Sequence, residues 1–107
     1  MLSPTQQGNH AVFTLEANQT EAEQEISIIN NEIKHLHGMA IASDPHVRPE
    51  FDVILADAAG NVQKKMHVKI GEVDRFGESV DLRLPDSRYK IHLENVRGAK
   101  SIDIFAD

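Results

Sequence analysis

The sequence predicts an all-β fold, a sandwich of seven to eight short antiparallel strands. Apolar and polar residues alternate along most of the chain, which is the pattern of strands with one buried face. Turn-forming residues recur roughly every 8–12 residues between these stretches. The chain has 107 residues, the usual size of one domain with one core. We therefore expect a single sandwich domain over residues 10–107, preceded by a flexible segment over residues 1–9.

Residues 20–43 follow the first predicted strand and fit two different structures. A helix over residues 21–37 is supported by a heptad-like spacing of apolar residues, and Thr20 with Glu23 fits a capping box. Two strands are supported by the many isoleucines and by Asn30-Asn31, which favours a turn over a helix interior. We prefer two strands because the remaining chain is β. The helix would instead give an α+β domain that forms a coiled-coil oligomer.

Alternating apolar residues place the other strands in order. The first strand runs through residues 11–15, and residues 51–70 form a hairpin around a turn at Asp57 and Gly60. In this turn Asp57 can bond its own backbone, and Gly60 can adopt a positive φ. A loop is expected over residues 71–78. The last three strands follow from alternation over residues 80–84, 89–93 and 102–104, with a tight turn at residues 85–87.

The order of these segments resembles the bacterial and phage immunoglobulin-like modules. In those modules one strand ends in Asn-Asn, the next runs through Leu-x-Gly-aliphatic, and a later Gly-Glu-Ser turn leads into another strand. The corresponding residues here are Asn30-Asn31, Leu36 to Met39 and Gly77 to Ser79. The similarity covers about residues 10–105. It implies an immunoglobulin-like β-sandwich with Leu36 pointing inward and Gly38 at a bulge, and it implies no catalytic residue.

Composition and charge argue against several classes of function. The chain has no cysteine, which excludes disulfides, thiol catalysis and cysteine-based zinc sites. Its net charge is −6, and it lacks the basic stripe with which proteins bind nucleic acid. We find neither a signal peptide nor an apolar run long enough for a membrane span. We therefore expect no nucleic-acid partner and no membrane insertion. The protein would be cytoplasmic, part of a virion, or the mature form of an exported protein.

His35 and His37 form a candidate metal site. On a strand, residues two apart project to the same side, so both imidazoles could bind one ion. A further ligand would have to come from another strand; the candidates are His67, His92, Glu32 and Asp44. In the simpler interpretation, the two histidines face water on the polar side of a sheet. Metal binding through His35 and His37 remains the alternative function.

Charge is unevenly distributed between the two halves of the chain. Residues 1–62 carry nine acidic and two basic residues, whereas residues 63–107 carry eight acidic and nine basic residues. The candidate partner-binding residues are Lys64, Lys65, Arg88 and Lys90. They could bind an acidic partner, including the N-terminal half of another copy, or they could form a solvated face with the acids nearby.

The sequence shows no pattern of residues that is typical of a catalytic site. The sequence contains neither a Gly-x-Ser-x-Gly nucleophile elbow nor a phosphate-binding glycine loop with lysine. We therefore expect no enzymatic activity, no catalytic residue and no cofactor. The predicted function is that of a non-catalytic, immunoglobulin-like structural or protein-binding module. Such a module would be an accessory or decoration subunit of a larger assembly, such as a virion or a cell-surface complex, with a protein partner or self-assembly.

Overall fold

The computed structural model describes residues 9–28, 32–83 and 87–107, and in these residues it contains eight β-strands and no helix. The strands are β1 (His10–Thr14), β2 (Ala22–Ile28), β3 (Glu32–Ala42), β4 (Glu50–Asp57), β5 (Val62–Lys69), β6 (Arg75–Arg83), β7 (Ser87–Arg97) and β8 (Ala99–Ala106). Every paired set of strands is antiparallel. The prediction of an all-β sandwich of seven to eight antiparallel strands is confirmed.

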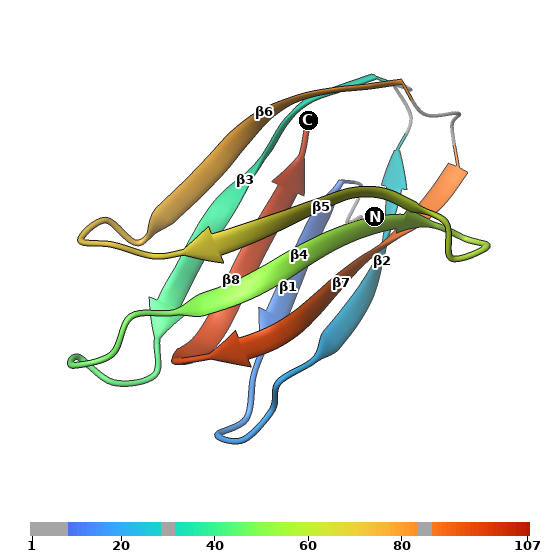
Figure 1. The fold of residues 1–107 in the computed structure, drawn as a ribbon. Coiled ribbons are helices and arrows are strands. Elements are labelled where there is room, and N and C mark those ends of the chain that lie inside the picture. Colours follow the sequence, from blue (N-terminus) through green and yellow to red (C-terminus); the bar gives the residue numbers. More distant parts are fainter. Residues whose placement is uncertain (1–8, 29–31, 84–86) are drawn as a thin grey trace, which may run out of the picture.

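The strands form two four-stranded sheets that lie against each other (Figure 1). Sheet A has the order β1-β8-β3-β6, and sheet B has the order β2-β7-β4-β5. Apart from the β4–β5 hairpin, each connection passes from one sheet to the other. This order is that of a jelly roll built from Greek keys, whereas immunoglobulin domains place their strands in ABED and CFG sheets. The immunoglobulin-like prediction thus holds for the sandwich architecture, while the strand order differs.

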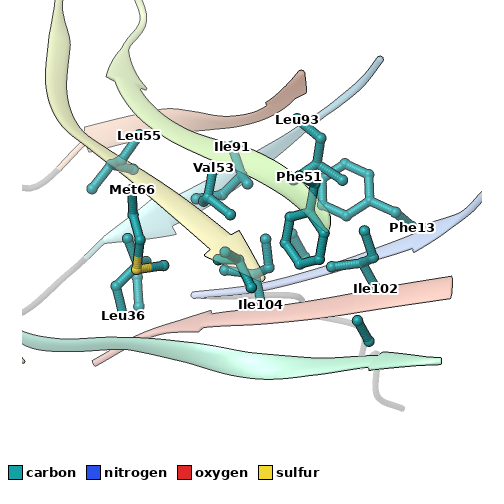
Figure 2. Close-up of a cluster of buried hydrophobic side chains, with 14 of the residues drawn as sticks. Phe13, Leu36, Phe51, Val53, Leu55, Met66, Ile91, Leu93, Ile102 and Ile104 are labelled. Carbon is teal, nitrogen blue, oxygen red and sulfur yellow. The ribbon is translucent and has the colours of Figure 1, made fainter. Parts of the chain in front are cut away.

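Alternation along the strands places one set of side chains between the sheets. In β4, Phe51, Val53 and Leu55 are fully buried, and the ring of Phe51 packs edge-on against Phe76 of the other sheet at 5.4 Å between centroids. Burial of such a side chain stabilises the fold by roughly 1.5–3 kcal/mol. Figure 2 shows the core that results, with labelled side chains from both sheets. They are Phe13, Leu36, Phe51, Val53, Leu55, Met66, Ile91, Leu93, Ile102 and Ile104.

The ambiguous segment at residues 20–43 forms strands, so the helix over residues 21–37 and the α+β alternative are excluded. β2 and β3 lie in different sheets, and the predicted turn at Asn30-Asn31 between them lies outside the described residues. The predicted bulge at Gly38 is wrong: β3 is irregular between Ile33 and His35 and between Ile41 and Ala42. Gly38 instead allows β3 and β8 to approach each other closely, because a methyl group at this position would overlap the carbonyl oxygen of Asp103. Leu36 is buried, as the resemblance implied.

The loop predicted over residues 71–78 is shorter than expected. β6 begins at Arg75, five residues before the predicted strand, because residues 75–79 pair with β3 from Met39 to His35. Phe76 is thereby placed against the core. The turn predicted at residues 85–87 falls mostly on residues 84–86, which lie outside the described residues.

The β4–β5 hairpin has the turn chemistry that the sequence predicts. The Asp57 carboxylate accepts hydrogen bonds from the backbone of Ala59 at 3.0 Å and of Asn61 at 2.8 Å. Gly60 has a φ of 94°, which favours glycine. Hydrogen bonds from the Asn61 side chain and then its backbone hold the pKa of the Asp57 carboxyl below its ordinary value.

The predicted flexible segment over residues 1–9 falls largely on residues 1–8, which lie outside the described residues. Asn9 is held to the end of β8. Its side-chain amide donates to the carbonyl oxygen of Ala106 at 2.8 Å, and its own carbonyl oxygen accepts from the Ala106 backbone at 3.1 Å. The ordered sandwich therefore includes Asn9.

Candidate functional site

The two outer faces of the sandwich differ in chemistry. Face A is formed by the side chains of sheet A that project away from the core, and face B by those of sheet B. Cross-strand partners project to the same side of a sheet, so the register assigns each residue to a face. Face A comprises His10, Val12, Thr14, Glu32, His35, His37, Met39, Ile41, Arg75, Gly77, Ser79, Arg83, Ser101, Asp103 and Phe105. Face B comprises Glu23, Glu25, Ser27, Glu50, Asp52, Ile54, Ala56, Val62, Lys65, His67, Lys69, Arg88, Lys90, His92, Glu94 and Arg97.

Acidic and basic residues pair with one another along β2 and β7 on face B. Arg88 lies 3.5 Å from Glu25, and Lys90 lies 3.6 Å from Glu23. Since all four side chains are well exposed, each pair contributes little, roughly 0–1 kcal/mol. The acidic N-terminal half of the chain and the basic C-terminal half therefore meet within one molecule.

The predicted partner-binding residues do not form one patch. Arg88 and Lys90 lie on β7, and Lys64 and Lys65 lie on β5, on the far side of β4. Lys64 bonds Glu78 of β6 at 2.8 Å, joining the two sheets at one side of the sandwich, whereas Lys65 is opposite Ile54 on face B. A role of these four residues in partner binding stays a prediction, and the structure places only Arg88 and Lys90 together on one face of the same strand.

His67 on face B is held by two carboxylates. Its Nδ1 lies 2.7 Å from Oδ1 of Asp52, and its Nε2 lies 2.9 Å from Oε2 of Glu50. The other oxygen of Asp52 accepts a hydrogen bond from the side-chain amide of Asn95 at 2.9 Å. The hydrogen bond to Asp52 is the main cause that raises the pKa of His67. The same bond, followed by that from Asn95, lowers the pKa of the mostly buried Asp52.

A second histidine on face B also lies among carboxylates. The His92 ring nitrogens are 3.3 Å from Glu23, 3.4 Å from Glu94 and 3.6 Å from Glu21. His92 Nδ1 is buried and has no hydrogen-bond partner of good geometry among the described residues. Face B thus combines charged pairs with two histidine–carboxylate clusters.

On the opposite sheet, His35 and His37 project to the same side, as predicted. Both line one surface hollow, together with Gly77, Glu78 and Ser79. The candidate third ligands lie elsewhere: His67 and His92 on face B, Glu32 with Lys34 at 3.3 Å, and Asp44 in a turn where it accepts from the His46 backbone at 2.8 Å. Within residues 9–28, 32–83 and 87–107, no group of three or more histidine, cysteine, aspartate or glutamate residues could hold a metal ion. Metal binding by the pair stays a prediction without a third ligand in this part of the chain.

A row of rings crosses face A. His10, Phe105 and His37 are cross-strand neighbours on β1, β8 and β3. The rings of His10 and Phe105 are stacked with centroids 4.0 Å apart and planes 7° apart, and those of Phe105 and His37 with centroids 5.4 Å apart and planes 16° apart. His37 Nε2 also lies 2.9 Å from Oδ1 of Asp107. The ring of His37 is therefore held by a stacking neighbour and by a carboxylate.

Gly77 on β6 is the next position in this row, opposite His37. Because glycine has no side chain, the row of rings ends at a hollow of about 350 Å³, which we name the Gly77 hollow. Its lining residues are His35, His37, Gly77, Glu78 and Ser79. Because Gly77 has no side chain, the hollow lies directly beside His37, and a methyl group at position 77 would come within 3.1 Å of the His37 Cβ.

Three apolar side chains lie in the two rows that follow the ring row on one side of face A. Val12 is 50% exposed and Ile41 is 42% exposed, and Met39 lies half-buried between Asp103 and Arg75. Exposed apolar side chains gathered with aromatic rings are typical of surfaces that another protein covers. The arrangement is thus suited to binding.

Sequence reasoning found His35 and His37 but missed His10 and Phe105. The signal for Phe105 was present, because Ile102 and Ile104 were predicted to point inward and Phe105 then had to point outward. Stacking with His10 depends on the pairing of β1 with β8, whose residues are about 90 positions apart in the sequence. That register could not be deduced from local patterns.

Comparisons with known proteins show only a distant structural likeness. No protein family and no curated protein sequence matches the chain. Among solved structures, a β-glucosidase from Paenibacillus barengoltzii is similar over 90% of this chain and 10% of its own length, at 10% sequence identity and a TM-score of 0.42. The described residues contain no helix of the length and apolar character that would cross a membrane.

Proposed function

We propose that the chain is a non-catalytic structural or protein-binding module, of the kind that its resemblance to immunoglobulin-like modules implies. It would serve as an accessory or decoration subunit of a larger assembly, such as a virion or a cell-surface complex. The observation that supports this proposal is the contrast between the two outer faces. Face B carries the charged pairs of β2 with β7 and two histidine–carboxylate clusters, whereas face A carries a row of stacked rings with Val12, Met39 and Ile41 nearby.

The chemistry of face A favours a protein as its partner. Removal of apolar surface from water gains about 25 cal/mol per Å², so Val12, Ile41 and Met39 would contribute once covered. The Asp103 carboxylate lies between Val12 and Met39, and the guanidinium of Arg75 lies beyond Met39 in the same row. Protein interfaces commonly combine apolar contacts with polar and charged groups.

A pair of matched variants tests this proposal. Val12→Lys adds a charge to face A, and Val73→Lys adds the same charge to the β5–β6 loop, where Val73 is 64% exposed. The tagged chain and both variants would be used to purify the native assembly from its source, with quantitative mass spectrometry of the recovered proteins. We expect Val12→Lys to reduce recovery of the wild-type partner at least tenfold and Val73→Lys to leave it unchanged.

Size-exclusion chromatography with light scattering would show whether the partner is a second copy. A monomer that recovers the same protein with wild type and with Val12→Lys would contradict a role of face A. Catalytic turnover by the purified chain without a partner would contradict the proposal as a whole.

A further inference from the structure

The ring row on face A places one ring on each of three neighbouring strands and ends at Gly77. Neighbouring strands of a sheet lie about 4.8 Å apart, and aromatic rings stack favourably over similar distances. The ring centroids of His10 and Phe105 lie 4.0 Å apart, and those of Phe105 and His37 lie 5.4 Å apart. Both distances agree with the strand spacing and with aromatic stacking. A fourth ring placed one strand further would lie over Gly77, beside His37.

The Gly77 hollow is suited in size and chemistry to such a ring. Its volume of about 350 Å³ lies at the lower end of the range for ligand sites. Its lining combines the flat imidazole of His37 with the polar groups of His35 and Ser79. These can hydrogen-bond the hydroxyl of a tyrosine or the N–H of a tryptophan. The His37 ring is held beforehand by Asp107 and Phe105, so binding requires little ordering of this wall.

We propose that the Gly77 hollow receives an aromatic side chain of the partner protein, with its ring parallel to His37. This inference rests on the proposed protein-binding function and specifies the chemistry of the anchor. Tyrosine and tryptophan are the residues that most often dominate binding when they insert into a preformed pocket.

The anchor comes from a different protein rather than from a second copy of this chain. The sequence contains five phenylalanine and tyrosine residues and no tryptophan. Phe13, Phe51 and Tyr89 are buried in the core, and Phe76 and Phe105 are half-buried. None of these five rings is exposed and available for insertion into the hollow of a neighbouring copy.

Small model compounds test the site without knowledge of the partner. The probes are the N-acetyl amides of tyrosine and tryptophan, with those of leucine and arginine for comparison. Each would be titrated into the ¹⁵N-labelled chain while the amide signals of Gly77, His37 and Ser79 are followed by NMR. We expect saturable shifts for the two aromatic compounds, with dissociation constants on the order of 1–10 mM, and at least tenfold weaker effects of the leucine and arginine compounds.

Three variants localise the binding. His37→Ala removes the stacking surface and Ser79→Leu fills the hollow from its rim, so each should weaken the aromatic compounds at least tenfold. His10→Ala removes a ring of the same type from the far end of the row and should leave their affinity unchanged. Circular dichroism and the dispersion of the NMR spectrum report whether each variant is folded. Ser79→Leu keeps the test decisive if His37→Ala does not fold.

Several outcomes would overturn the inference. These are the absence of saturable shifts at Gly77, equal or tighter binding of the leucine or arginine compound, and unchanged binding by Ser79→Leu. The Val12→Lys experiment does not depend on the hollow. Loss of the partner in Val12→Lys without aromatic binding would therefore refute the ring site alone, whereas aromatic binding without an effect of Val12→Lys would refute the proposed contact of the partner with the Val12 region of face A.

Discussion

At the scale of single residues, the coupling of His67 and Asp52 makes a pH-dependent contribution to folding. The folded-state pKa of His67 is raised above its ordinary value of 6.5. The stability that it contributes is therefore fully present below pH 6.5 and is lost as the pH rises through the raised pKa. The pKa of Asp52 is lowered from 3.8, so its contribution is present above pH 3.8 and is lost as the pH falls through the lowered value.

Substitution of Asp52 tests this coupling. We expect Asp52→Asn to lower the pKa of His67, because the hydrogen bond to the Asp52 carboxylate is the largest cause of the shift. Glu50→Gln weakens the hydrogen bond that raises the pKa of His67 by the smaller amount, so this variant should lower the His67 pKa less than Asp52→Asn does. NMR titration of the His67 ring in the three proteins measures both effects. An unchanged His67 pKa in Asp52→Asn would contradict the geometry described for this cluster.

Asn95 combines a backbone role with a side-chain role. Its φ of 54° lies in the left-handed region, and its amide donates to Asp52. Asn95→Gly removes the side-chain hydrogen bond while glycine still adopts the positive φ, and it should cost about 1 kcal/mol. Asn95→Ala also strains the backbone and should cost roughly 1 kcal/mol more. Urea denaturation measures the difference, and equal stability of the two variants would show that the positive φ is not required.

At the scale of elements, the pairing of β3 with β8 depends on Gly38. A methyl group there would overlap the Asp103 carbonyl oxygen, so Gly38→Ala must push the two strands apart. We expect a loss of roughly 3 kcal/mol or more, which is large for a point substitution. Gly71→Ala is the matched control, since its methyl group would meet no atom closer than 3.9 Å. Thermal denaturation of both variants provides the test, and a Gly38→Ala protein as stable as Gly71→Ala would contradict the close approach.

The edge strand β2 carries acidic residues that we expect to prevent strand-to-strand association. Glu23 and Glu25 project from face B at this edge, beside a segment of high β-propensity. Replacement of both by valine should therefore promote aggregation, measured by light scattering during incubation at 37 °C. The same replacement at Glu16 and Glu72, which are exposed in loops, changes the charge equally and should have little effect. Equal aggregation of the two double variants would show that net charge, rather than the edge, is decisive.

Local sequence patterns were sufficient for most strands but not for their arrangement. Alternation predicted the inward positions of Phe51, Val53 and Leu55 and the turn at Asp57, because these features depend on neighbouring residues. The start of β6 was missed, since residues 75–79 are strand only through their pairing with β3. The jelly-roll order was missed for the same reason, as it depends on contacts between distant segments.

The candidate site likewise combines features that local sequence patterns predict with features that depend on distant segments. His35 and His37 were found because residues two apart share one side of a strand. The ring row needs β1, β8 and β3 side by side, and the Gly77 hollow needs β6 beside them. Cross-strand register therefore determines the site, and a single sequence gives little access to it.

At the scale of the whole molecule, the two outer faces of the sandwich differ in what they carry. Acidic residues of β2 pair with basic residues of β7 on face B, and Lys64 with Glu78 links the two sheets. Part of the charge asymmetry of the sequence is therefore neutralised within one molecule. Face A carries the row of stacked rings, so it is the surface on which the account of function depends.

Oxidative footprinting of the native assembly tests the role of face A most directly. Met39 and His37 lie on face A, His67 and His92 lie on face B, and the buried Met66 serves as an internal reference. Hydroxyl radicals would be applied to the isolated chain and to the purified assembly, and the oxidation of each residue would be measured by mass spectrometry. We predict that oxidation of Met39 and His37 falls several-fold in the assembly while His67 and His92 react as in the isolated chain. Protection of His67 and His92 with Met39 and His37 unchanged would contradict the account.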